Sequence, residues 1–85
     1  MEVNLNGTLL FIKNDDVPGV IGKVGSLLGE NSINIGAYLL SQNSEKSLAF
    51  AVIRLDSPIS LELIRQLQAI EEVKFVNQIE INEPH

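Results

Sequence analysis

In the first half of the chain, apolar runs alternate with short polar breaks. Thr8–Ile12 is apolar at odd and even positions alike, that is, on both parities of a strand, which predicts a central strand that is buried on both faces or nearly so. Turn-forming and capping residues follow at Asn14–Gly19, with Pro18 at the expected first helical position. The helix predicted next ends near Gly29–Asn31, and its apolar stripe consists of Val20, Ile21, Val24, Leu27 and Leu28.

The second half predicts two more strands, a helix and a last strand. Apolar residues alternate with others over Ile33–Leu40, and the polar run Ser41–Ser47 then indicates a hairpin loop. Leu48–Leu55 is apolar almost throughout and predicts another central strand. A helix begins at Ser57–Pro58 or Ser60, with an apolar face of Leu63, Ile64, Leu67 and Ile70. The alternation over Val73–Ile81 predicts an edge strand whose charged face prevents it from pairing with other chains.

The element order is therefore βαββαβ, an α+β arrangement. Right-handed helical crossovers join parallel strands, and a hairpin joins the two halves. We expect a ferredoxin-like sandwich, a four-stranded antiparallel sheet with two helices on one face, and one domain over residues 1–85. Leu and Ile occupy both parities of the central strands, so a second copy is the simplest cover for the other face. Alternatively, β-branched residues simply suit exposed sheet positions.

Composition narrows the function. The chain has 85 residues, 45% of them apolar, and a net charge of −5 that opposes phosphate backbones, so we expect no nucleic-acid partner. An RNA-recognition domain needs exposed aromatic residues on its central strands, where only Phe11 and Phe50 are available. No cysteine, membrane-length apolar run or secretory signal is present, so we expect a cytoplasmic protein without disulfides, with no membrane partner.

The candidate binding feature is the turn Asp16–Val17–Pro18–Gly19–Val20. A helix begins with backbone N–H groups that lack internal partners and carry partial positive charge, and Gly19 lets a small anion approach them. Asp16 offers a negative charge for an ammonium group. Because a free amino acid carries both charges close together, this turn suits its backbone. The alternative is that Asp and Pro are ordinary residues of a helix start.

Two further features have a functional and a structural interpretation. Asn34 stands between Ile33 and Ile35 on the opposite strand face, and its amide either binds a polar ligand or bridges backbone in the preceding turn. Three helical glycines, each costing roughly 1 kcal/mol relative to Ala, either admit another backbone or a ligand closely or reflect a weak helix. They are Gly22, Gly25 and Gly29.

Catalytic chemistry has little support, and we expect no catalytic residue, metal or cofactor. The adjacent acidic pairs Asp15–Asp16 and Glu71–Glu72 diverge, so neither forms an acid–base dyad. The serines have no internal His to activate them, since the single His is the terminal His85. An acylphosphatase on this fold would need an Arg near a Gly-rich phosphate loop, and Arg54 and Arg65 are elsewhere.

The run Asn14–Gly25, followed by Leu27–Gly29 and Ile33–Ile35, closely resembles the ACT domain family, in particular the C-terminal regulatory domains of D-3-phosphoglycerate dehydrogenases. The resemblance extends over about the whole chain and is densest from Asn14 to Tyr38. It implies domains that pair side by side through the sheet and the first helix, with L-serine bound at the dimer interface. Serine regulates a catalytic domain that would lie elsewhere on the full-length chain. A related domain accompanies bacterial L-serine dehydratases, and a dimerisation module without ligand is the further alternative.

The same resemblance implies a role for individual residues. Asp16 would hold the ligand's amino group, and amides around Gly19 and Val20 would face its carboxylate. Asn34, with Ile35 beside it, would reach in from the neighbouring chain. Asn14 would contribute where some relatives carry His or Tyr, and Val17 and Pro18 would complete the turn.

Overall fold

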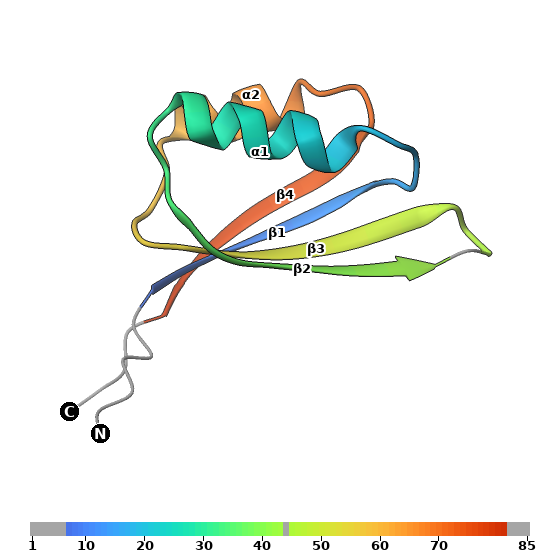
Figure 1. The fold of residues 1–85 in the computed structure, drawn as a ribbon, viewed down its shortest axis with the longest axis horizontal. Coiled ribbons are helices and arrows are strands. Elements are labelled where there is room, and N and C mark those ends of the chain that lie inside the picture. The colour runs from blue at the N-terminus through green and yellow to red at the C-terminus, as the bar shows by residue number, and fades with distance from the viewer. Residues whose placement is uncertain (1–6, 44, 82–85) are drawn as a thin grey trace.

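The computed structural model describes residues 7–43 and 45–81, so the terminal His85 lies outside the described residues. The element order is βαββαβ, as predicted (Figure 1). Neither helix in this part of the chain is long and apolar enough to cross a membrane. The elements are β1 Gly7–Asp15, α1 Val20–Glu30, β2 Ile35–Asn43, β3 Leu48–Leu55, α2 Leu61–Gln68 and β4 Val73–Ile81.

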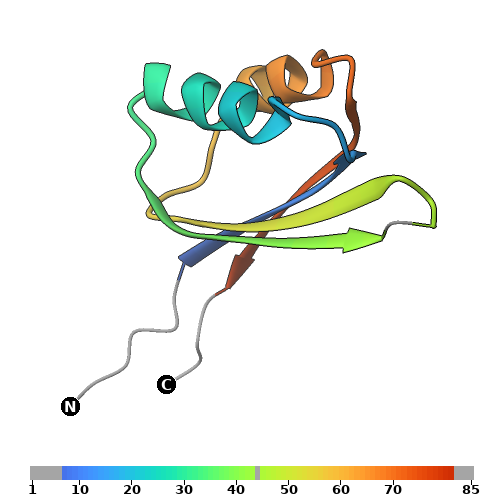
Figure 2. The same ribbon diagram turned by 45° about the vertical axis from the view of Figure 1, so that its right-hand side comes forward.

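The four strands form one sheet in the order β2-β3-β1-β4, and every neighbouring pair is antiparallel. The two strands that flank each helix run in the same direction but are not neighbours. Both helices lie on one face of the sheet (Figures 1 and 2). The expected ferredoxin-like sandwich is confirmed, with β2 and β4 as its free edges.

The core lies between the sheet and the two helices. Alternate residues of β1 and β3 are buried, and they face the helices. The other parity of the central strands, including Leu9, Phe11 and Val52, is only half-buried, and Phe50 is exposed. The large side chains with almost no exposed surface are Leu10, Leu28, Ile53, Leu55, Leu67, Val20 and Val24.

The two helices begin differently. Helix α2 follows Ser60, the second of the two predicted starts, and Ser60 Oγ accepts a 3.1 Å hydrogen bond from Leu63 N. Helix α1 begins one residue after Gly19, which is the N-cap with φ 92°, so the prediction of Pro18 at the first helical position is wrong. Gly tolerates this left-handed backbone because it has no Cβ. The chain needs this sharp reversal after Pro18 before the helix can start.

The edge strands depart from the simple patterns. Strand β2 continues through Ser41–Asn43, so the hairpin loop predicted from Ser41 is too long. Strand β4 contains a bulge, because Val73 and Phe75 pair with the consecutive residues Asn14 and Lys13. The extra residue reverses the alternation.

As a result, β4 does not present a charged outer face. Val73 and Val76 are both buried against the helices, whereas Phe75, Ile79 and Ile81 lie on the open face of the sheet and are exposed. The prediction that β4 is an edge strand holds, but the prediction that charges protect its exposed face is wrong.

Candidate ligand-binding site

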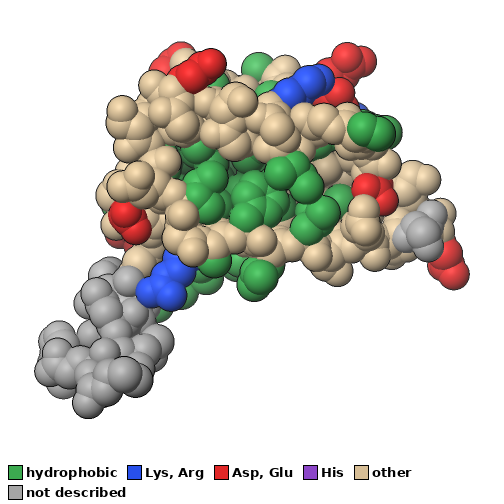
Figure 3. All heavy atoms as spheres, viewed as in Figure 1, with side chains coloured by type: hydrophobic (Ala, Val, Ile, Leu, Met, Phe, Trp, Pro, Cys, Tyr) green, Lys and Arg blue, Asp and Glu red, His purple; other side chains and the backbone are tan. Residues whose placement is uncertain are grey.

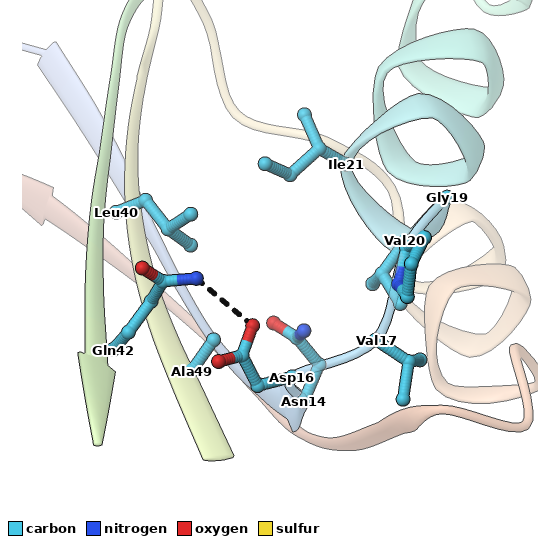
Figure 4. A pocket seen from close by; sticks show the side chains of 10 residues that line it. Asn14, Asp16, Val17, Gly19, Val20, Ile21, Leu40, Gln42 and Ala49 are labelled. Atoms are coloured by element: carbon cyan, nitrogen blue, oxygen red, sulfur yellow. Dashed lines mark hydrogen bonds between the residues drawn. The ribbon is translucent and has the colours of Figure 1, made fainter. Parts of the chain in front are cut away.

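An open pocket of about 300 Å³ lies between the start of α1 and the end of β2 (Figure 4). Its walls come from the turn after β1, the first residues of α1 and two neighbouring strands. The lining residues are Asn14, Asp16, Val17, Pro18, Gly19, Val20, Ile21, Leu40, Gln42 and Ala49.

The start of α1 faces this pocket without a side-chain cap. Gly19 O accepts the first helical hydrogen bond from Lys23 N at 3.0 Å, but no side chain in the described part of the chain accepts from the N–H groups of the first turn. The first turn of α1 contains no acidic residue, whereas α2 has Glu62 there. The amides at the start of α1 are therefore available to an anion, and the helix dipole favours negative charge at this position.

The Asp16 carboxylate stands on the other side of the pocket from the start of α1 (Figure 4). Its Oδ1 accepts a 3.0 Å hydrogen bond from Gln42 Nε2 of β2. Its backbone N donates to Ser47 O at 2.9 Å, which joins the turn to the β2–β3 hairpin. Asp16 thus does not cap α1, and the interpretation of this residue as an ordinary helix cap is wrong.

Asn14 is 4% exposed and forms part of the pocket floor. Its Nδ2 donates to the Asp15 carbonyl at 2.8 Å, which fixes the orientation of the amide. The amide points into the pocket beside the Asp16 carboxylate (Figure 4). A buried amide with a defined orientation offers a directional contact to a polar ligand.

The arrangement suits a small zwitterion. A cation beside Asp16 and an anion at the start of α1 would lie on opposite walls of one small pocket. The apolar side chains of Ile21, Leu40 and Ala49 border the rest of the pocket.

The structure brings together six of the eight residues singled out from the sequence. Asn34 and Ile35 do not line the pocket, because they lie near the start of β2, at the opposite end of that strand from Gln42. Ile35 is 37% exposed and Asn34 is also exposed. A single copy therefore does not bring Asn34 to this pocket.

Four lining residues were missed from the sequence: Ile21, Leu40, Gln42 and Ala49. The alternation along β2 could have indicated two of them, since Tyr38, Leu40 and Gln42 share the face toward the helices. Gln42 also pairs with Ala49 in the hairpin, which explains why both reach the pocket. Among residues 7–43 and 45–81, no group of three or more His, Cys, Asp or Glu side chains could hold a metal ion.

This βαββαβ fold is shared with solved ACT domains. The solved ACT domain from the GTP pyrophosphokinase of Chlorobium tepidum superposes with a TM-score of 0.67 at 14% identity, over 87% of this chain and 99% of that domain. No family model matches the sequence.

In sequence the chain resembles one segment of the D-3-phosphoglycerate dehydrogenases, as expected from the residues. It is 28% identical to the Bacillus subtilis protein over 75 residues, which cover 88% of this chain and 14% of that protein. It is 33% identical to D-3-phosphoglycerate dehydrogenase 2, chloroplastic, of Arabidopsis thaliana over 79 residues, which cover 89% of this chain and 13% of that protein. The chain thus spans about one seventh of the length of these relatives.

Proposed function

We propose that this chain is a regulatory ACT domain that binds a small α-amino acid, L-serine, and controls a dehydrogenase of the D-3-phosphoglycerate dehydrogenase kind. The domain itself carries no reaction in this proposal, and a catalytic domain would lie elsewhere on the full-length chain. The similarity to these dehydrogenases favours this host over an L-serine dehydratase. A cytoplasmic location remains a prediction.

One observation carries the proposal: the uncapped start of α1 faces the Asp16 carboxylate across a small pocket. The ligand's carboxylate would accept from the first amides of α1 and take the place of the missing cap. Its ammonium group would bind Asp16, whose second oxygen accepts no hydrogen bond from the residues that the structure describes. Each contact involves a charged group, and such hydrogen bonds are about twice as strong as neutral ones.

The free edge of β2 supports a dimer that completes the site. In an antiparallel pairing of β2 with the same strand of a second copy, the start of one strand lies opposite the end of the other. A pairing centred on Tyr38 or Leu39, the middle of β2, would bring the partner subunit's Asn34 or Ile35 opposite Gln42 or Asn43. The partner's Asn34 would then stand beside the pocket and could bind the ligand's polar side chain.

The side of α1 above β2 is also open. Ile21 is 49% exposed and lies near Leu40, which is 40% exposed (Figure 4). Apolar side chains gather in the gap between α1 and β2 (Figure 3). Gly25 follows Ile21 by four residues, so it shares this side of the helix. A Cβ built at Gly25 would meet nothing within 4 Å. A second α1 can therefore approach here without a clash from this chain.

Regulation would follow from a ligand that touches two subunits. Such a ligand binds more tightly to the arrangement that presents the partner's Asn34 to the pocket than to any other arrangement. Only this difference in affinity can shift the equilibrium between subunit arrangements. The host enzyme would sense that shift through the connection between its domains.

Thermal unfolding of the 85-residue chain with each of the twenty amino acids tests the proposal. Circular dichroism is the suitable probe, because the chain has one Tyr and no Trp. At tenfold excess over its Kd a ligand adds about 1.4 kcal/mol of stability. For a domain of this size each kcal/mol raises Tm by roughly 4–8 °C. We expect L-serine to raise Tm by several degrees.

Asp16→Ala should remove this shift while the fold remains intact. The matched control is Asp15→Ala, which deletes the neighbouring carboxylate that lies 3.4 Å from Lys74 Nζ and does not line the pocket. Unchanged Tm with serine and its close analogues at millimolar concentration contradicts ligand binding. A dimer that persists without any amino-acid effect would instead identify a purely structural dimerisation module.

A further inference from the structure

The face of the sheet opposite the helices gathers all three phenylalanines of the chain. Phe11 lies on β1, Phe50 on β3 and Phe75 on β4, and each has the parity that points away from the helices. Phe50 is 45% and Phe75 is 51% exposed. Both pair with Lys13, so they flank β1 from either side. Together with Phe11 they line a shallow hollow of about 490 Å³.

The apolar surface extends across the whole width of the sheet. Leu39 on β2 is 67% exposed, and Ile79 and Ile81 on β4 are 44% and 37% exposed. With roughly 200 Å² for a fully exposed large apolar side chain, these three residues and the two exposed phenylalanines present about 500 Å². The half-buried side chains add to this area. An exposed apolar patch of this size is often a site where the protein binds another molecule.

Charged side chains also lie on this face, and one of them, Lys13, stands between Phe50 and Phe75 and lines the hollow. Among the strand residues that the structure describes, Lys13, Asp15 and Arg54 are the charged side chains on this face, and Asp15 lies at the end of β1 with its carboxylate 3.4 Å from Lys74 Nζ. Lys13 and Arg54 lie on either side of Phe11, since Lys13 follows it by two residues on β1 and Arg54 of β3 pairs with Leu9. Long cationic side chains in such places can lie along apolar surface and keep their charges in water.

We propose that two copies of this chain pack these open faces together, sheet against sheet. A broad four-stranded face is best matched in shape by another sheet, at about 10 Å between layers. The five exposed side chains alone supply more than half of the roughly 800 Å² per partner of a stable interface. The surface is separate from the β2 edge and from the ligand pocket. Where dimers also form through β2, the two contacts together give a tetramer with two kinds of two-fold interface.

Sedimentation velocity of the 85-residue chain between about 10 and 500 µM tests this proposal, with the wild type, Phe50→Asp and a control. The control is Leu61→Asp, because Leu61 is 72% exposed and lies on α2, in the layer on the other side of the sheet. We expect Phe50→Asp to halve the number of copies in the wild-type assembly. Leu61→Asp should leave that number unchanged.

Circular dichroism checks that each variant is folded, and Phe75→Asp on the edge strand replaces Phe50→Asp if the latter does not fold. Equal assembly sizes for the wild type and the folded Asp variant at 500 µM overturn the proposal. The amino-acid thermal shift of the folded variant is read separately. If the variant loses the open-face contact but keeps the serine shift, the proposed ligand site is unaffected. If the assembly is intact but serine causes no shift in Tm, only the proposal of ligand binding is rejected.

Discussion

Gln42 Nε2 donates a 3.0 Å hydrogen bond to Asp16 Oδ1 and so joins the end of the edge strand β2 to the turn before α1. The bond holds the carboxylate over the pocket and occupies one of its two oxygens. It also links the proposed ligand anchor to the strand that would pair with a second copy.

Gln42→Ala should weaken serine binding about fivefold, which corresponds to the roughly 1 kcal/mol of a typical hydrogen bond. The Asp16 carboxylate would lose its fixed orientation and bind the ammonium group less well. Because the bond is exposed, we expect the free energy of unfolding to change by less than about 0.5 kcal/mol. Isothermal titration calorimetry measures the affinity. Ser41→Ala, on the opposite face of β2, is the control, and equal affinities for Gln42→Ala and the wild type would remove Gln42 from the site.

Gly25→Ala separates the stability of the single chain from that of the dimer. A Cβ here meets no atom of this chain, and Ala favours helix over Gly by up to about 1 kcal/mol. The monomer should therefore be as stable as the wild type or more so. If two α1 helices approach on this side, the added methyl group should raise the dimer Kd at least tenfold, as measured by sedimentation equilibrium.

Ser26→Ala provides the comparison for that experiment, because Ser26 is exposed and points away from the side of α1 that carries Ile21 and Gly25. It should improve helix propensity without changing the dimer. A dimer Kd that is unaffected by Gly25→Ala would show that α1 lies outside the subunit contact.

Glu72 gives the domain a pH-dependent contact. Lys23 Nζ of α1 approaches Glu72 Oε2 at 2.8 Å, and this hydrogen bond, with a smaller contribution from the backbone, lowers the pKa of the Glu72 carboxyl. Because the folded pKa is below the unfolded value of about 4.5, the contribution of this ion pair to the stability of the fold is complete above that value. It is lost as the pH falls through the folded pKa.

Lys23→Met should consequently flatten the loss of stability below about pH 4.5, the unfolded pKa. Urea unfolding at a series of pH values measures the slope. Lys46→Met removes an equal charge from the β2–β3 turn and should keep the wild-type slope. An equally steep acid limb in Lys23→Met would mean that this ion pair is broken in solution.

Leu28→Ala tests the core below α1. Leu28 has no exposed surface, so truncation should lower the free energy of unfolding by about 2–5 kcal/mol. A domain of this size is stable by only about 4–13 kcal/mol, so the variant should be partly or fully unfolded at elevated temperature. Leu61→Ala, at a site that is 72% exposed, should change stability by less than about 0.5 kcal/mol in the same urea titration.

The sequence predicts the elements well wherever burial imposes a regular pattern. Strand β3 is predicted with its observed bounds, since its alternate residues face the core. Of the two predicted starts of the second helix, Ser60 is correct and Ser57–Pro58 is not, because the Ser60 hydroxyl caps the helix directly. The fold class follows from the order of these elements.

The errors in the sequence-based predictions arise where the role of a residue depends on contacts with distant parts of the chain and not on its own burial. Ser41 and Gln42 have the polarity of loop residues but belong to an edge strand that is exposed along most of its length. The bulge at Lys74 depends on pairing with β1, and alternation along one strand cannot reveal it. The Asp16–Gln42 bond joins residues 26 positions apart, so it requires the folded hairpin.

The missing cap of α1 would give the proposed ligand a structural role. Without a cap the first turn of a helix frays more readily, so we expect this turn to be less stable than the capped start of α2. The turn before α1 is also joined to the β2–β3 hairpin by the hydrogen bond from Asp16 N to Ser47 O. A bound carboxylate would act as the N-cap of α1, and its binding would order the first turn of the helix beside the free edge of β2. In such a sensor, the signal is the local order that the ligand adds.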